Sequence, residues 1–250
     1  YGASFQIAGV IGHASLLAFA LYPKLLVRRR TEDVVTAFKS FLMFAIPMTV
    51  GAIVFSDSYL TILDIKYKVA SPILQMLAFF IFISGFSQIL DSIVFGTEKI
   101  DLEAKIPLRE LVKTKLFLVF SFPYARSLIV LPSVYIILTT IGNDPLAAAF
   151  YTVIIMLFAG VILLIARVIF VKGLFPFSFP WVNVVKYLFA SAVMGVLLLV
   201  IPHPTKLSTT LGYTLIGGIV YLSTLMAIDR DTRSMVRSII EEAKRILRFT

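Results

Sequence analysis

Long apolar runs, separated by short polar and mostly basic segments, make up nearly the whole chain. A run of about 20 apolar residues is long enough to cross a bilayer as a helix. Seven runs reach or approach this length: residues 5–26, 38–55, 72–95, 116–139, 146–171, 187–201 and 211–228. The sixth is the shortest, although residues 182–185 could extend it. The pattern predicts an all-α integral membrane protein with about seven transmembrane helices.

Composition supports this prediction. Hydrophobic residues make up 59% of the 250 positions, whereas charged residues make up only 15%, which is more apolar sequence than a soluble core needs. The formal net charge is +9, but the basic residues fall in short clusters between the runs, so nucleic acid is not expected as a partner. The absence of cysteine excludes disulfides and thiolate metal sites. The chain opens on Tyr1 without an initiator Met or a signal peptide, so we expect a fragment of a longer protein.

The basic residues also predict an orientation. Nineteen of the 23 Lys and Arg residues, including Arg167, belong to the side that follows the first, third, fifth and seventh runs. Only Lys66, Lys68 and Lys206 lie on the other side. Because cytoplasmic loops carry the excess of positive charge, the N-terminus is expected outside and the C-terminus in the cytoplasm.

Arg126 is the candidate functional residue that the pattern singles out most clearly. It lies eleven positions after Lys115, roughly 16 Å along a helix and near the middle of a hydrocarbon layer about 30 Å thick. A central Arg costs about 2.5 to 3.5 kcal/mol on insertion scales, so it normally faces a watery cavity or a partner charge. Asp91 is the only acidic candidate partner within a run, and it lies closer to a helix end. A hydrated, anion-binding cavity is therefore the preferred interpretation, and a buried ion pair is the alternative.

Five further polar residues inside the runs are candidates for a role. Gln6 and His13 share one face of the first, and Gln75 and Gln88 lie on the third, so all four are candidates for lining the cavity. Such residues are more often interhelical hydrogen-bond partners than ligands. Asp91 is a candidate ion or proton relay, or it simply reaches the interface. No cofactor or metal is expected, because the two histidines are isolated, and the chain carries none of the short catalytic motifs of hydrolases or glycosyltransferases.

The polar connections have a pattern of their own. Thr31 is predicted to cap a surface helix that leads into the second run, with Glu32 and Asp33 in its first turn. Residues 229–250 are predicted to form a cytoplasmic amphipathic helix that lies on the anionic leaflet or packs on a neighbouring loop. Pro47 interrupts the second run, and Pro123 and Pro132 flank Arg126, so kinked helices are expected.

Several motifs occur in an order that resembles a known family of transporters. They are Tyr1-Gly2-Ala3, Leu21-Tyr22-Pro23-Lys24-Leu25, Ile46-Pro47-Met48 with Gly51, Tyr67-Lys68-Val69-Ala70, Gly96-Thr97-Glu98-Lys99 and Asn143-Asp144-Pro145-Leu146-Ala147-Ala148. Together they resemble the Wzx-like polysaccharide flippases of the multidrug/oligosaccharidyl-lipid/polysaccharide (MOP) superfamily, which have a MATE-like fold. The resemblance covers nearly all of this chain but only the later half of such a protein.

The resemblance implies a set of expectations about organisation and activity. The chain would correspond to helices 8–14 of a fourteen-helix member, with residues 1–171 as five helices of the C-terminal lobe, whose first helix is missing, and 172–228 as two additional helices. Such a carrier would move a lipid-linked oligosaccharide across the cytoplasmic membrane by alternating access, with membrane lipids and the missing N-terminal lobe, or a partner chain, as its neighbours. The matched motifs are structural, so they transfer no functional residue.

Three alternatives stay open at this point. A drug or ion antiporter of the same superfamily would share the fold. An integral membrane glycan-processing enzyme is less favoured, because the acidic or histidine clusters that such enzymes use are missing. A seven-helix receptor or rhodopsin is disfavoured because the seventh run contains no Lys for a retinal Schiff base.

Overall fold

The computed structural model of the protein describes residues 1–16, 30–97, 114–141 and 143–233. Over these ranges the chain is helical and contains no strand. The elements are α1 (Gly2–Gly12), η1 (His13–Ser15), α4 (Thr31–Val54), α5 (Ser56–Leu63), η2 (Ile65–Ala70), α6 (Ser71–Thr97), α8 (Lys115–Ile141), α9 (Pro145–Leu174), α10 (Trp181–Val200) and α11 (Leu207–Ile228). Six of the described helices, α4, α6, α8, α9, α10 and α11, are long and apolar enough to cross a membrane. The protein is therefore an all-α, multi-pass membrane protein.

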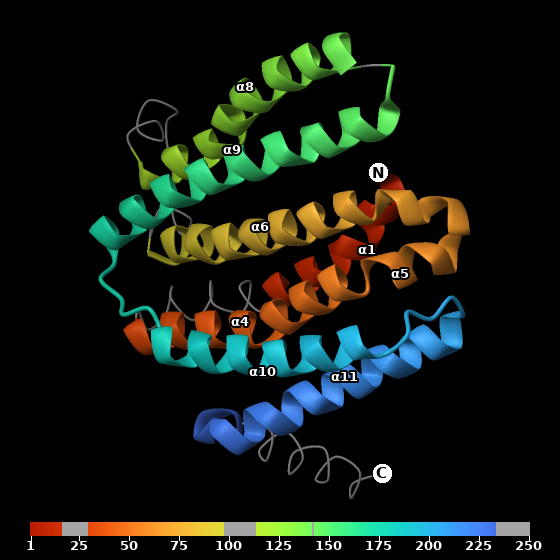
Figure 1. The fold of residues 1–250 in the computed structure, drawn as a ribbon. Helices are drawn as coiled ribbons and strands as arrows, with labels where there is room; N and C mark the ends of the chain where they lie inside the picture. The colour runs from red at the N-terminus through yellow and green to blue at the C-terminus, as the bar shows by residue number, and fades with distance from the viewer. Residues whose placement is uncertain (17–29, 98–113, 142, 234–250) are drawn as a thin grey trace, which may run out of the picture.

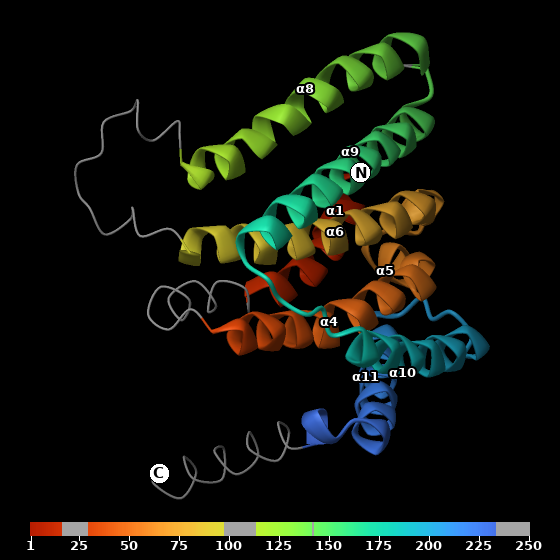
Figure 2. The ribbon, with the colours of Figure 1, turned by 90° about the vertical axis from the view of Figure 1, so that its left-hand side faces the viewer.

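The long helices form a stack in which α8 and α9, α6 and α4, and α10 and α11 run in opposite directions, whereas α9 and α6, and α4 and α10, run in the same direction (Figure 1). The order through the stack is α8, α9, α6, α4, α10 and α11, and α1 packs against both α6 and α4. A side view shows α9 between α8 and α6 (Figure 2). We call the ends that the basic residues predict to face the cytoplasm the inner ends, and the opposite ends the outer ends. The short elements α5 and η2 connect α4 to α6 at the outer end.

The helix boundaries confirm most of the apolar runs and change three predictions. The sixth run begins earlier than 187, because α10 starts at Trp181 and reaches 20 residues. The prediction of a separate surface helix before the second run is wrong, since α4 is continuous from Thr31 to Val54. The prediction of Thr31 as the N-cap is also wrong: Arg30, with an extended backbone, is the cap, and no side chain makes a capping hydrogen bond. The first run, 5–26, begins in α1 and continues into residues outside the described ranges.

The continuity of α4 follows from its buried face. Val34, Phe38 and Phe41 are fully buried and recur at helical spacing from the first turn onward. The buried face of the membrane-spanning helix therefore begins in the first turn of α4. Pro47 lies inside α4, and Pro123 and Pro132 lie inside α8, without ending either helix.

Helices α4 and α6 approach each other closely at Gly85. A Cβ atom built at this position would lie 2.7 Å from the ring of Phe41. Phe41 is itself fully buried, and its ring packs against Phe82 and Phe86 of α6 at centroid distances of 5.8 and 6.4 Å. The ring therefore has little room to move, and the helices can cross here because residue 85 has no side chain.

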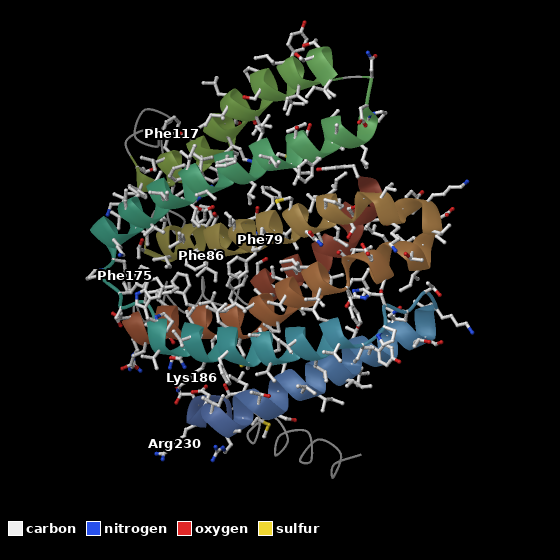
Figure 3. All side chains as sticks on the ribbon, viewed as in Figure 1. Phe79, Phe86, Phe117, Phe175, Lys186 and Arg230 are labelled. Atoms are coloured by element: carbon white, nitrogen blue, oxygen red, sulfur yellow. The ribbon has the colours of Figure 1, made fainter. Side chains whose placement is uncertain are left out.

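At the inner end, ion pairs join α4, α10 and the end of α11. Lys186 donates a 2.8 Å hydrogen bond to Asp229, which is 1% exposed and also accepts from the backbone and hydroxyl of Thr232. Burial alone would raise the pKa of Asp229, but the hydrogen bonds from Lys186 and Thr232 outweigh it and hold the pKa below its usual value. Lys39 pairs with Asp231 at 2.7 Å. Figure 3 shows Lys186 and Arg230 at this end.

The segment after Asp229 is only partly described. Residues 230–233 continue as a helical turn, and Arg233 donates to the carbonyls of Met226 and Ala227 at the end of α11. The rest of the predicted amphipathic tail, residues 234–250, lies outside the described ranges.

Candidate functional site: a cationic pocket between three helices

A partly enclosed pocket of about 430 Å³ lies between α6, α8 and α9. Its lining combines apolar and polar side chains from all three helices. The polar and charged members are Ser84, Ser87, Gln88 and Asp91 on α6, Arg126 and Ser127 on α8, and Arg167 on α9. Charged side chains are rarely found at membrane depth without a function, so this is the strongest candidate site in the described part of the chain.

The polar face of α6 arises from helical spacing. Positions 84, 87, 88 and 91 follow an i, i+3, i+4, i+7 pattern, so all four side chains lie on one side of the helix. Phe86 lies on the side that faces α4, where its ring packs 5.1 Å from the ring of Phe38 (Figure 3). One face of α6 therefore packs in the core while the other lines the pocket.

Arg126 contributes a positive charge that no acidic side chain neutralises within the described ranges. It is half-buried, and its Cζ atom lies 4.6 Å from the centroid of the Phe80 ring. Such a cation–π contact is worth about 0.5 to 2 kcal/mol and fixes the guanidinium without cancelling its charge. The charge of Arg126 is thus left for water or for an incoming anion.

Asp91 is paired with Arg167, not with Arg126. The Nε atom of Arg167 donates to Oδ1 of Asp91 at 2.8 Å, and the two side chains are 12% and 21% exposed. The guanidinium of Arg167 also lies 4.3 Å from the centroid of the Phe122 ring. The ion pair considered as the alternative for Arg126 is therefore not formed with Asp91.

The sequence pattern predicts Arg167 only as a marker of the cytoplasmic side, whereas the structure places it in the pocket. It lies seven positions before the end of α9, roughly 10 Å from the inner end of that helix. Its partner Asp91 lies six positions before the end of α6, at a similar depth of roughly 9 Å. A signal was present, because Arg167 lies inside the run 146–171, but the identity of its partner depends on how α6 and α9 pack.

The other candidates divide into two groups. Gln88 lines the pocket together with Asp91 and Arg126. Gln75 does not, because its Nε2 atom donates to the Ser56 hydroxyl at 3.0 Å and joins α6 to the α4–α5 turn. Gln75 is thus an interhelical hydrogen-bond partner, the role that such residues most often have.

Gln6 and His13 are exposed on α1 and η1, and neither lines the pocket. Nδ1 of His13 lies 3.3 Å from the Val10 carbonyl of its own helical segment. The structure therefore brings together three of the six sequence candidates and adds Arg167, Ser84 and Ser87 to them. Within the described residues, no group of three His, Cys, Asp or Glu side chains could hold a metal ion.

Comparison of the chain with family models, curated proteins and solved structures gave no match. The functional assignment therefore rests on the pocket itself and on the ordered motifs in the sequence.

Proposed function

We propose that the chain is part of a membrane carrier that moves a lipid-linked oligosaccharide, a polysaccharide precursor, across the cytoplasmic membrane by alternating access. The observation that carries the proposal is Arg126, a guanidinium without an acidic partner among the described residues, which lines the pocket near the middle of α8. Carriers of this kind bind their cargo near the midplane between two lobes. The missing N-terminal lobe, or a partner chain, would close the other side.

The lining of the pocket fits a cargo with an anionic head group and sugars. A planar guanidinium binds phosphate oxygens through two parallel hydrogen bonds, so Arg126 suits a phosphate or diphosphate link. Ser84, Ser87 and Gln88 provide hydroxyl and amide groups that can hydrogen-bond sugar hydroxyls or phosphate oxygens. The outward face of α8 is apolar, with Leu128 80% exposed, and suits contact with lipid chains.

A drug or ion antiporter is the second candidate, and the observation that favours it is Asp91. A carboxylate in a membrane pocket can exchange a proton or hold a cationic ligand. The two candidates differ in the charge that matters: a cationic ligand needs Asp91, whereas an anionic cargo needs Arg126.

Export of the glycan by the complete protein tests the proposal. Arg126→Ala should abolish export while protein abundance stays near normal, because removing a central charge does not hinder insertion. Arg126→Lys should restore export only in part, since Lys keeps the charge but lacks the planar pair of donors. Lys206→Ala, which removes an exposed cation at the outer end, is the matched control and should export normally. Full export by Arg126→Leu would refute the proposal.

A further inference from the structure

The pocket holds two guanidinium groups but only one of them is neutralised. We propose that Asp91 is an internal counter-ion that competes with a bound phosphate group for Arg167, so that Arg167 becomes a second anion-binding residue when Asp91 leaves it. The inference rests on the proposed function, because it takes Arg126 as the first anion-binding residue. The inference adds to the proposed function that the pocket prefers head groups with two phosphates. It also adds that re-formation of the Asp91–Arg167 ion pair releases them.

The geometry of the pair allows exchange. Asp91 engages Arg167 through a single hydrogen bond, from Nε to Oδ1 at 2.8 Å. A guanidinium carries five N–H donors, and its strongest contacts with carboxylate or phosphate use two of them in parallel. Within the described ranges, the Nη groups of Arg167 donate no hydrogen bond to protein. A phosphate oxygen pair can therefore offer Arg167 a better contact than Asp91 does.

The charge balance of the pocket points to the same exchange. Among the described residues, the charged side chains that line it are Asp91, Arg126 from α8 and Arg167 from α9, so its net charge is +1. The helices α1 and α4, which pack on other faces of α6, contribute no charged side chain to this lining. A diphosphate carries at least two negative charges, which one net positive charge balances poorly. Once the Asp91 carboxylate has turned away or has taken a proton from water, two guanidiniums face the anion.

Both guanidiniums are held independently of Asp91. Arg126 rests on the Phe80 ring at 4.6 Å, and Arg167 rests on the Phe122 ring at 4.3 Å. These contacts keep each cation in the pocket when the counter-ion moves. Arg167 also lies nearer the inner end than Arg126, roughly 10 Å against 16 Å along their helices. An anion from the cytoplasmic side would reach the Asp91–Arg167 pair first, and re-formation of the pair would weaken the hold on the anion afterwards.

Binding of two diphosphate probes to the purified complete protein, with orthophosphate for comparison, tests this. The probes are inorganic pyrophosphate in solution and geranylgeranyl diphosphate in detergent micelles, which separate a free anion from a lipid head group. At pH 8, Asp91→Asn should bind at least one probe about tenfold more tightly than wild type, and orthophosphate should gain less. Asp57→Asn, which removes a carboxylate paired with Lys68 at the outer end, is the matched control and should leave affinity unchanged.

A double variant separates the counter-ion from a structural role. Asp91→Asn with Arg167→Gln replaces the ion pair by a neutral hydrogen-bonding pair of similar size, and its affinity should fall to the wild-type level or below. Unchanged affinity in folded Asp91→Asn, or a gain in the double variant equal to that in the single variant, would overturn the inference. The probe that shows the gain identifies the source of the anion.

A pH series keeps the inference testable if Asp91→Asn fails to fold. Arg167→Gln provides the baseline for protonation of the probe itself. The affinity of wild type relative to this baseline should rise as the pH is lowered from 8 to 5, because protonation of Asp91 frees Arg167. A ratio that stays constant or falls as the pH is lowered across this range would contradict the inference. If Arg126→Leu binds both probes like wild type, the proposed function fails instead, whereas loss of binding in Arg126→Leu without a gain in Asp91→Asn refutes only the counter-ion.

Discussion

The hydroxyl of Tyr221 on α11 donates a 2.6 Å hydrogen bond to the backbone carbonyl of Met43 on α4. Pro47 follows Met43 by four positions and has no N–H, so it cannot supply the donor that this carbonyl would receive in an uninterrupted helix. Tyr221 is 3% exposed, which places the contact where water does not compete. A side chain from another helix therefore satisfies the carbonyl that Pro47 leaves without a partner.

Tyr221→Phe should lower the free energy of unfolding by about 1 to 3 kcal/mol, because a buried carbonyl loses its only replacement donor. Unfolding in mixed detergent micelles measures this, with Tyr124→Phe, at a 77% exposed position, as the control. In a Pro47→Ala background, the backbone N–H of residue 47 can bond Met43 again, so Tyr221→Phe should cost less there. Equal costs in the two backgrounds would disprove the link between Pro47 and Tyr221.

Gly85→Ala should destabilise the protein by about 1 to 3 kcal/mol, since the added methyl group meets the confined ring of Phe41. Gly51→Ala is the matched control: this glycine also lies within a helix, but a Cβ there meets nothing within 4 Å. Because Ala is favoured over Gly in helices by about 1 kcal/mol, Gly51→Ala should be neutral or stabilising. The same unfolding measurement should separate the two variants, and equal stability would show that α4 and α6 do not depend on Gly85 for their approach.

Asp229 should make stability depend on pH only under acidic conditions. Its pKa is lowered in the folded protein, so the stabilisation is complete above its unfolded value of about 4 and is lost as the pH falls through the folded value. The difference in unfolding free energy between wild type and Asp229→Asn, in a non-ionic detergent, should be constant from pH 7 to about 5 and shrink below about 4. A difference that disappears above pH 5 would contradict this role.

The orientation can be tested with single cysteines, because the chain has none of its own. Asn143→Cys, in the exposed turn before α9, should react with an impermeant thiol reagent added outside intact cells. Arg230→Cys, exposed after the end of α11, should react only after the membrane is opened. Thr232 is a poorer choice for the inner side, since it is 2% exposed. Labelling in the opposite sense would reverse the predicted topology.

The sequence predicted the helices well because membrane spans need long apolar runs, and these are visible without any tertiary information. The sequence did not predict that the start of α4 belongs to the membrane-spanning helix. The acidic first turn is typical of a surface helix, yet Val34 and Phe38 are part of the buried stripe of α4. Arg126 stood out by its depth alone. The sequence could not predict that Arg126 does not pair with Asp91, because Asp91 pairs instead with Arg167, which lies more than 70 positions away in the chain.

Gln6 and His13 were predicted to line the cavity, and the structure does not place them there. They share a helical face, which the sequence reveals, but which neighbour that face meets is decided by packing. The polar spacing of Ser84, Ser87, Gln88 and Asp91 was readable and would have identified one wall of the pocket. The remaining walls depend on α8 and α9 meeting this face, which no local pattern encodes.

Chemical rescue at position 126 tests the central claim most directly. In the complete protein, freed of any other cysteine, Arg126→Cys should fail to transport a lipid-linked oligosaccharide in reconstituted vesicles. Treatment with aminoethyl methanethiosulfonate places a cation back at this position and should restore part of the transport, because the pocket is only partly enclosed and the proposed cargo is anionic. The neutral methyl methanethiosulfonate should restore none. Wild-type transport by untreated Arg126→Cys, or equal recovery with the neutral reagent, would contradict the account.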